Sequence, residues 1–138
     1  MTQIPPEYLL AMAEQISFLS SFLGGFSATV FVTLLTLAKP GRAARLAIGL
    51  SALAAVSFIM AVVATTTLIF TLHPAAPASV ADNPVEALRL QMAGFFLLGI
   101  VGLLGAIGAS GWIRSKGLGV ITTIMASLGM IFSIAPMT

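Results

Sequence analysis

The charged residues of this chain are so few and so unevenly placed that they divide it into four long uncharged segments. Residues 15–38 hold 24 positions without a formal charge, 46–72 hold 27, 90–113 hold 24, and 117–138 hold 22. About 20 apolar residues in a helix are enough to cross the hydrocarbon core of a bilayer, which is roughly 30 Å thick. The pattern therefore predicts an all-α, polytopic membrane protein in which each segment is a transmembrane helix.

The composition excludes a soluble fold. Only 7% of the 138 residues are charged and 59% are apolar, whereas about 25% of the residues in an ordinary soluble domain are charged. The apolar runs are continuous rather than alternating, which argues against a membrane β-barrel. We predict one domain over 1–138, a four-transmembrane-helix bundle with short cytoplasmic turns, spans at about 15–38, 46–72, 90–113 and 117–136, and an extracytoplasmic loop at 73–88.

Local signals mark the expected helix ends. Pro40 and Gly41 follow the first uncharged segment, and both resist continuation of a helix. Before the third segment, Asn83 suits the N-cap position, Pro84 suits N1 and Glu86 falls at N3, an arrangement similar to a capping box. The sequence therefore predicts a turn near residue 40 and a helix start at residue 84.

The basic residues predict the orientation of the chain. Five of the six flank the first and last turns, namely Lys39, Arg42, Arg45, Arg114 and Lys116. By the positive-inside rule these turns are cytoplasmic, so both termini and the 73–88 loop are extracytoplasmic. The alanine- and glycine-rich composition without cysteine favours a bacterial inner membrane.

The residues needed for most catalytic chemistry are missing from the sequence. There is no cysteine, His73 is the only histidine, and no glycine loop with a phosphate-binding lysine is present. Paired nucleophile and base residues, or clustered metal ligands, therefore cannot be assembled from this chain. The net charge of +2 lies in short clusters beside apolar segments, not along a basic face. We expect no enzymatic activity, no cofactor, no metal and no nucleic-acid partner.

The first predicted helix carries a stripe of small and hydroxylic side chains. The stripe repeats every four residues after an acidic residue, and its members are Glu14, Ser17, Ser21, Gly25, Thr29 and Thr33. In one interpretation the hydroxyl groups donate to carbonyl oxygens one turn back and the stripe packs on another helix of the same subunit. In the other, the stripe lines a water-filled path or an oligomer axis, with Glu14 at the outer mouth.

The third predicted helix carries a second candidate packing face. On a helical wheel five small residues fall within roughly one third of the circumference, namely Gly94, Gly102, Gly105, Ala106 and Ala109. Small residues let membrane helices approach closely, so we interpret this face as a helix–helix seam. The recurrence of glycine at every third position, from Gly99 to Gly108, drifts around the helix and does not define a single contact face.

Three classes of function are compatible with these features. The first is a non-catalytic membrane subunit that assembles with itself or with a partner membrane protein through small-residue helix faces. The second is a homo-oligomeric pore or channel, including a membrane-permeabilising effector, with the first helix lining the path. The third is a carrier for a small substrate. In each class the lipid bilayer is the surrounding solvent.

Overall fold

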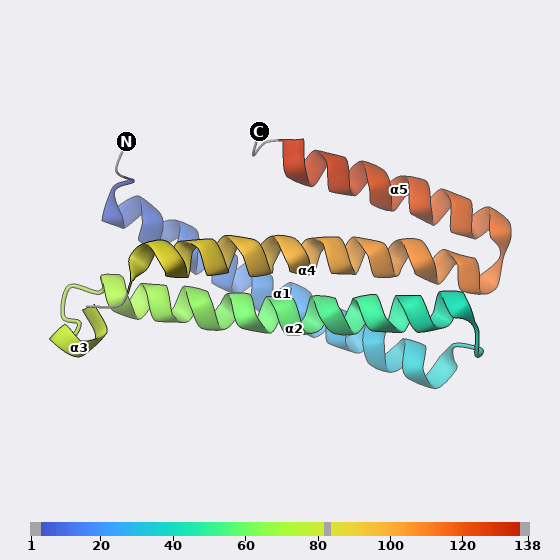
Figure 1. The fold of residues 1–138 in the computed structure, drawn as a ribbon, viewed down its shortest axis with the longest axis horizontal. Helices are drawn as coiled ribbons and strands as arrows, with labels where there is room; N and C mark the ends of the chain where they lie inside the picture. The colour runs from blue at the N-terminus through green and yellow to red at the C-terminus, as the bar shows by residue number, and fades with distance from the viewer. Residues whose placement is uncertain (1–3, 82–83, 136–138) are drawn as a thin grey trace.

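The computed structural model describes residues 4–81 and 84–135 and is helical almost throughout (Figure 1). The helices are α1 (Pro6–Leu37), α2 (Arg42–Leu72), α3 (Ala78–Ala81), α4 (Val85–Arg114) and α5 (Lys116–Ile134). All but the one-turn α3 are long and apolar enough to cross a membrane. The prediction of an all-α membrane bundle with four long helices is confirmed.

The four long helices pack mainly with their neighbours in the chain. α2 and α4 form the central antiparallel pair, α1 packs on α2, and α5 packs on α4. Figure 1 shows α1 crossing the pair obliquely and α5 leaning away from α4 toward its C-terminal end. In the part of the chain that the structure describes, α1 and α5 do not pack on each other. The bundle is therefore open on the side between its first and last helices.

The ends of the helices differ in detail from the predicted ends. α1 begins at Pro6, well before the uncharged segment, because a helix can continue into the polar flank of a span. Pro84 is the N-cap of α4 and not its N1 residue as predicted, so Glu86 falls at N2 and not at N3. Asn83 lies outside the described residues. The 73–88 loop contains α3, which the sequence analysis did not predict.

The buried face of α2 explains why this helix is central. Its fully buried residues follow a spacing of three and four, and they are Ala47, Ser51, Ala54, Phe58, Ala61, Thr65 and Leu68. This is the heptad spacing by which two helices interlock their side chains. Because most of these residues are small, a neighbouring helix can approach the α2 backbone closely.

Two apolar clusters join α1, α2 and α4 along the bundle. In the first, Leu9 of α1 meets Leu68 of α2 and Met92 of α4. In the second, the Phe58 ring packs against Phe96 with ring centroids 6.1 Å apart and an interplanar angle of 68°. Such edge-to-face pairs are the preferred geometry for aromatic rings. α5 contributes to neither cluster, and its buried apolar residue Ala126 packs against Gly108 of α4 instead.

Candidate functional site

The polar stripe predicted on the first helix lies on the open surface of α1. Ser17 is half-buried and the rest of the stripe is exposed. Hydroxyl groups of Ser21, Thr29 and Thr33 donate to carbonyl oxygens one turn back, at 2.8, 3.0 and 2.8 Å. A Cβ atom at Gly25 would have no neighbour within 4 Å among the described residues. The hydroxyl groups therefore bond as in the first interpretation, but within the described residues the stripe packs on no other helix.

The face of α1 that packs on α2 is displaced by one residue from the stripe. Ser20, Gly24 and Ser27 are buried there. A Cβ atom at Gly24 would lie 3.2 Å from the Cβ of Phe58. The sequence analysis missed this row because it runs beside an equally small one. Its members Ala13, Ser20 and Ser27 repeat every seven residues, but so do Glu14, Ser21 and Ala28 of the exposed face, so the spacing alone does not identify the buried row.

A groove runs between the exposed stripe and α2. It has a volume of about 330 Å³ and is lined by the following residues: Ser20, Ser21, Gly24, Gly25, Ala28, Ile59, Val62 and Val63. Small residues form its α1 side and branched aliphatic residues its α2 side. On the other side of the stripe, Phe18, Phe22 and Phe26 are exposed to 73%, 69% and 49%. The stripe is therefore a band of small side chains with larger apolar side chains on both sides.

Glu14 stands at the head of this stripe, on the surface. Its side chain is exposed and borders a hollow of about 430 Å³ together with Gln15, Phe18 and Leu19. The ion pair seen among the described residues joins Arg89 to Glu86, at 3.6 Å, and does not include Glu14. Along α1, Glu14 is about 37 Å from Lys39. The Glu14 carboxylate is therefore exposed on the outside of the bundle, toward the end opposite the basic turns.

The predicted seam on the third span is largely an internal contact between α4 and α2. Gly102, Ala106 and Ala109 are buried, and a Cβ atom at Gly105 would lie 3.0 Å from Leu50 Cδ1. At Gly102 the contact is with backbone, because a Cβ atom there would lie 3.2 Å from Ala54 N and from Leu50 O.

One member of the predicted seam lies outside the contact. Gly94 is exposed, and a Cβ atom there would meet nothing within 4 Å in the described part of the chain. Gly99, which the prediction omitted, is covered by the Phe58 ring. Gly108 faces α5, so the glycines at every third position divide between two neighbours, as their drift around the helix requires.

The α4–α5 hairpin is held at its turn by polar contacts. Ser115 is the single residue between the helices, and its side chain caps α5 by accepting from the Leu118 amide. Trp112 Nε1 donates to Thr123 Oγ1 at 2.9 Å. Thr122 Oγ1 lies 3.1 Å from the Gly108 carbonyl oxygen across the interface. These bonds fix α5 to α4 at one end only.

The fold and these surfaces define a multi-pass helical membrane protein with small-residue contact faces. The described residues contain no group of three or more histidine, aspartate or glutamate side chains that could hold a metal ion. Comparisons with family models, curated proteins and solved structures found no match. The functional argument therefore rests on the surfaces themselves.

Proposed function

We propose that this protein is a non-catalytic membrane subunit that assembles with itself or with a partner membrane protein through the α1 stripe. The observation that supports this is the exposed row of Ser21, Gly25 and Thr29, which has no partner helix within the described chain. In lipid, helices associate where small residues permit close packing, and this row offers such a place. The comparable row on α4 is already occupied by α2.

The test is a matched pair of glycine-to-leucine substitutions. Gly25→Leu places a bulky side chain on the stripe, whereas Gly49→Leu makes the same change on α2, at an equally open position off the stripe. We expect Gly25→Leu to reduce the native mass of the gently solubilised protein toward the monomer while the helix content is unchanged. Gly49→Leu should retain the wild-type mass. A monomeric wild-type protein without co-purifying partners contradicts the proposal.

A pore is the second candidate function, favoured by the common exposure of Glu14 and the stripe hydroxyls on one helix. If several α1 helices surround an axis, these groups line it and Glu14 attracts cations at its mouth. Glu14→Gln should then lower cation flux into liposomes without altering the native mass, and Gly25→Leu should abolish the flux. Absence of flux from well-assembled wild-type protein, across several ions and voltages, argues for the subunit role instead.

We also propose that the two basic turns are cytoplasmic, that both termini are extracytoplasmic and that the membrane is a bacterial inner membrane. The basic residues of both turns lie at one end of the bundle, and the positive-inside rule assigns that end to the cytoplasm. An impermeant thiol reagent should label a cysteine at Ser79 in intact cells and leave one at Ala43 unlabelled. Labelling in the reverse pattern overturns this orientation.

A further inference from the structure

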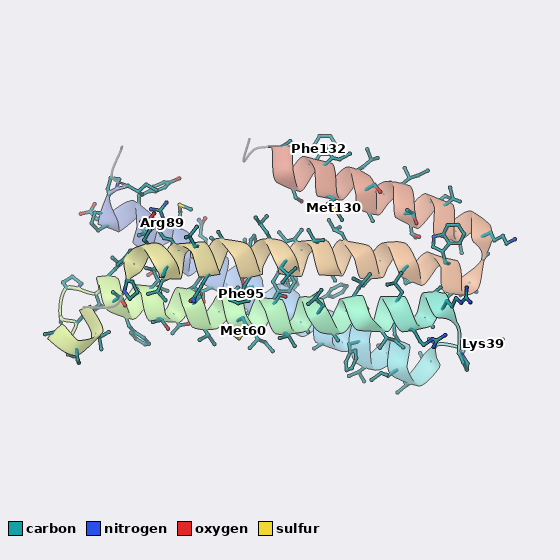
Figure 2. All side chains as sticks on the ribbon, viewed as in Figure 1. Lys39, Met60, Arg89, Phe95, Met130 and Phe132 are labelled. Carbon is teal, nitrogen blue, oxygen red and sulfur yellow. The ribbon has the colours of Figure 1, made fainter. Side chains whose placement is uncertain are left out.

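The two short turns of the bundle bring five basic residues to one end. Lys39, Arg42 and Arg45 come from the α1–α2 turn, and Arg114 and Lys116 come from the α4–α5 turn. Gly102 contacts Ala54 and Gly105 contacts Leu50, so the antiparallel register brings the first turn of α2 level with the last turn of α4. Figure 2 shows Lys39 at this end and Arg89 toward the other. All five basic side chains are exposed.

Among the described residues, no ion pair joins one of these five basic residues to a carboxylate. The acidic residue nearest to Lys39 in the sequence is Glu14, about 37 Å away along α1. From Arg114, Glu86 is about 42 Å away along α4. In addition, α2 begins at Arg42 and α5 at Lys116, and neither helix has an acidic residue in its first turn. Cations at the positive end of a helix are unfavourable, so an external anion would stabilise this arrangement.

An apolar groove begins directly beside the basic end. Where α5 leans away from α4, a hollow of about 260 Å³ opens, and its lining includes Leu46, Leu104, Trp112 and Met130. In Figure 2, Met130 points from α5 toward α4, whereas Phe132 points away. Trp112 lines the groove, is 47% exposed and stands two residues before Arg114 in the sequence. A ligand that fits this site combines an anionic head with an apolar chain.

We propose that this end of the bundle binds an anionic phospholipid, with its phosphate among the basic residues of both turns and one acyl chain in the α4–α5 groove. Each lysine or arginine near an anionic membrane surface contributes about fivefold in affinity. Arginine also recognises phosphate through paired N–H donors. A free phosphate ion would bind the basic residues but not the groove. Changes in the groove therefore distinguish a bound phospholipid from free phosphate.

Trp112 is the only tryptophan of the chain, so its fluorescence reports on the mouth of the groove. The full-length protein in neutral detergent is titrated with phosphatidylglycerol or phosphatidylcholine carrying brominated acyl chains, which quench nearby tryptophan. We expect phosphatidylglycerol to quench at a concentration at least about fivefold lower than phosphatidylcholine. High salt should reduce this preference, since exposed charges are screened. Equal quenching by the two lipids overturns the proposal.

Variants test the basic residues and the groove separately. The triple change Arg42→Gln, Arg45→Gln and Arg114→Gln should reduce the preference at least about fivefold, because only Lys39 and Lys116 remain. The corresponding lysine triple should retain most of the preference. Arg89→Gln, at the opposite end, is the control for loss of a basic residue and should behave as wild type. An unchanged preference in the glutamine triple overturns the assignment of the headgroup site.

Ser127 is an exposed α5 residue that lines the groove. Ser127→Phe should fill the groove and weaken quenching by phosphatidylglycerol, whereas Val120→Phe, on α5 outside the groove lining, should not. Competition by millimolar inorganic phosphate that removes the preference, with Ser127→Phe indistinguishable from wild type, shows a site for free phosphate and contradicts the lipid proposal.

Discussion

The central pair α2 and α4 and the flanking helices α1 and α5 are all apolar, yet they are buried to very different extents. Within the membrane-length segments, 39% of the residues of α2 and of α4 are buried, against 17% for α1 and 11% for α5. α2 and α4 also have the higher mean hydropathy of the four long helices, so burial and apolar character single out the same pair.

The difference in burial follows from the number of packing partners, because α2 and α4 each pack along two long helices whereas α1 and α5 each pack mainly along one. In lipid there is little hydrophobic gain when two helices associate, so close packing has to supply the stability. α2 and α4 present small residues at heptad spacing and meet backbone to backbone at Gly102 and Ala54. α5 also packs small residues on α4, with Ala126 against Gly108 and Gly129 against Leu104. Because α4 is its only long neighbour, its opposite face is exposed, including Ile121, Met125 and Phe132.

The largest expected effect is the loss of the central pair in Gly102→Leu. The new side chain would collide with the backbone of α2, which cannot move aside as a flexible side chain can. We expect a destabilisation of about 3 kcal/mol or more, at or above the usual range for overpacked cores. Thermal unfolding in detergent, followed by circular dichroism, measures it. Gly49→Leu, at an open position of α2, should unfold close to wild type, and equal losses in both variants would contradict the proposed core.

A smaller effect is expected where α5 joins α4. Thr123→Val removes the acceptor for Trp112 Nε1 with little change in side-chain volume. We expect a cost of about 0.5–1 kcal/mol, typical of one hydrogen bond between membrane helices. Trp112 emission should show that the α4–α5 hairpin unfolds at a lower temperature than in the wild type. The pair of α2 and α4 should unfold as in the wild type. Thr67→Val is the control, since that hydroxyl bonds only within α2.

The smallest effect on the fold is expected on the exposed stripe. Thr29 donates its hydroxyl hydrogen bond to Gly25 in its own helix, so Thr29→Val removes no contact between helices of this chain. The free energy of unfolding of the monomer should change by less than about 0.5 kcal/mol. Thr65→Val, on the fully buried face of α2, is the comparison and should cost more. A large loss of monomer stability in Thr29→Val would place the stripe inside the fold.

The sequence by itself determined the spans and the ends of the bundle. A charge in hydrocarbon is costly whatever its neighbours are, so the uncharged segments identified the long helices without knowledge of their packing. The turn at Pro40 and Gly41 was equally local, and it lies between α1 and α2 as predicted. Because successive long helices run in opposite directions, the sequence also predicted that the basic residues of both turns lie at one end of the bundle.

Only the tertiary structure decided which small residues are contacts. Ser20 and Gly24 lie one residue before Ser21 and Gly25, and the two rows are nearly identical in size and polarity. The position of Phe58 on α2 buries the first row and leaves the second open. Likewise, α2 buries Gly102 but does not reach Gly94. A helix sequence determines what each face offers, whereas the shape and register of its neighbour determine which face is used.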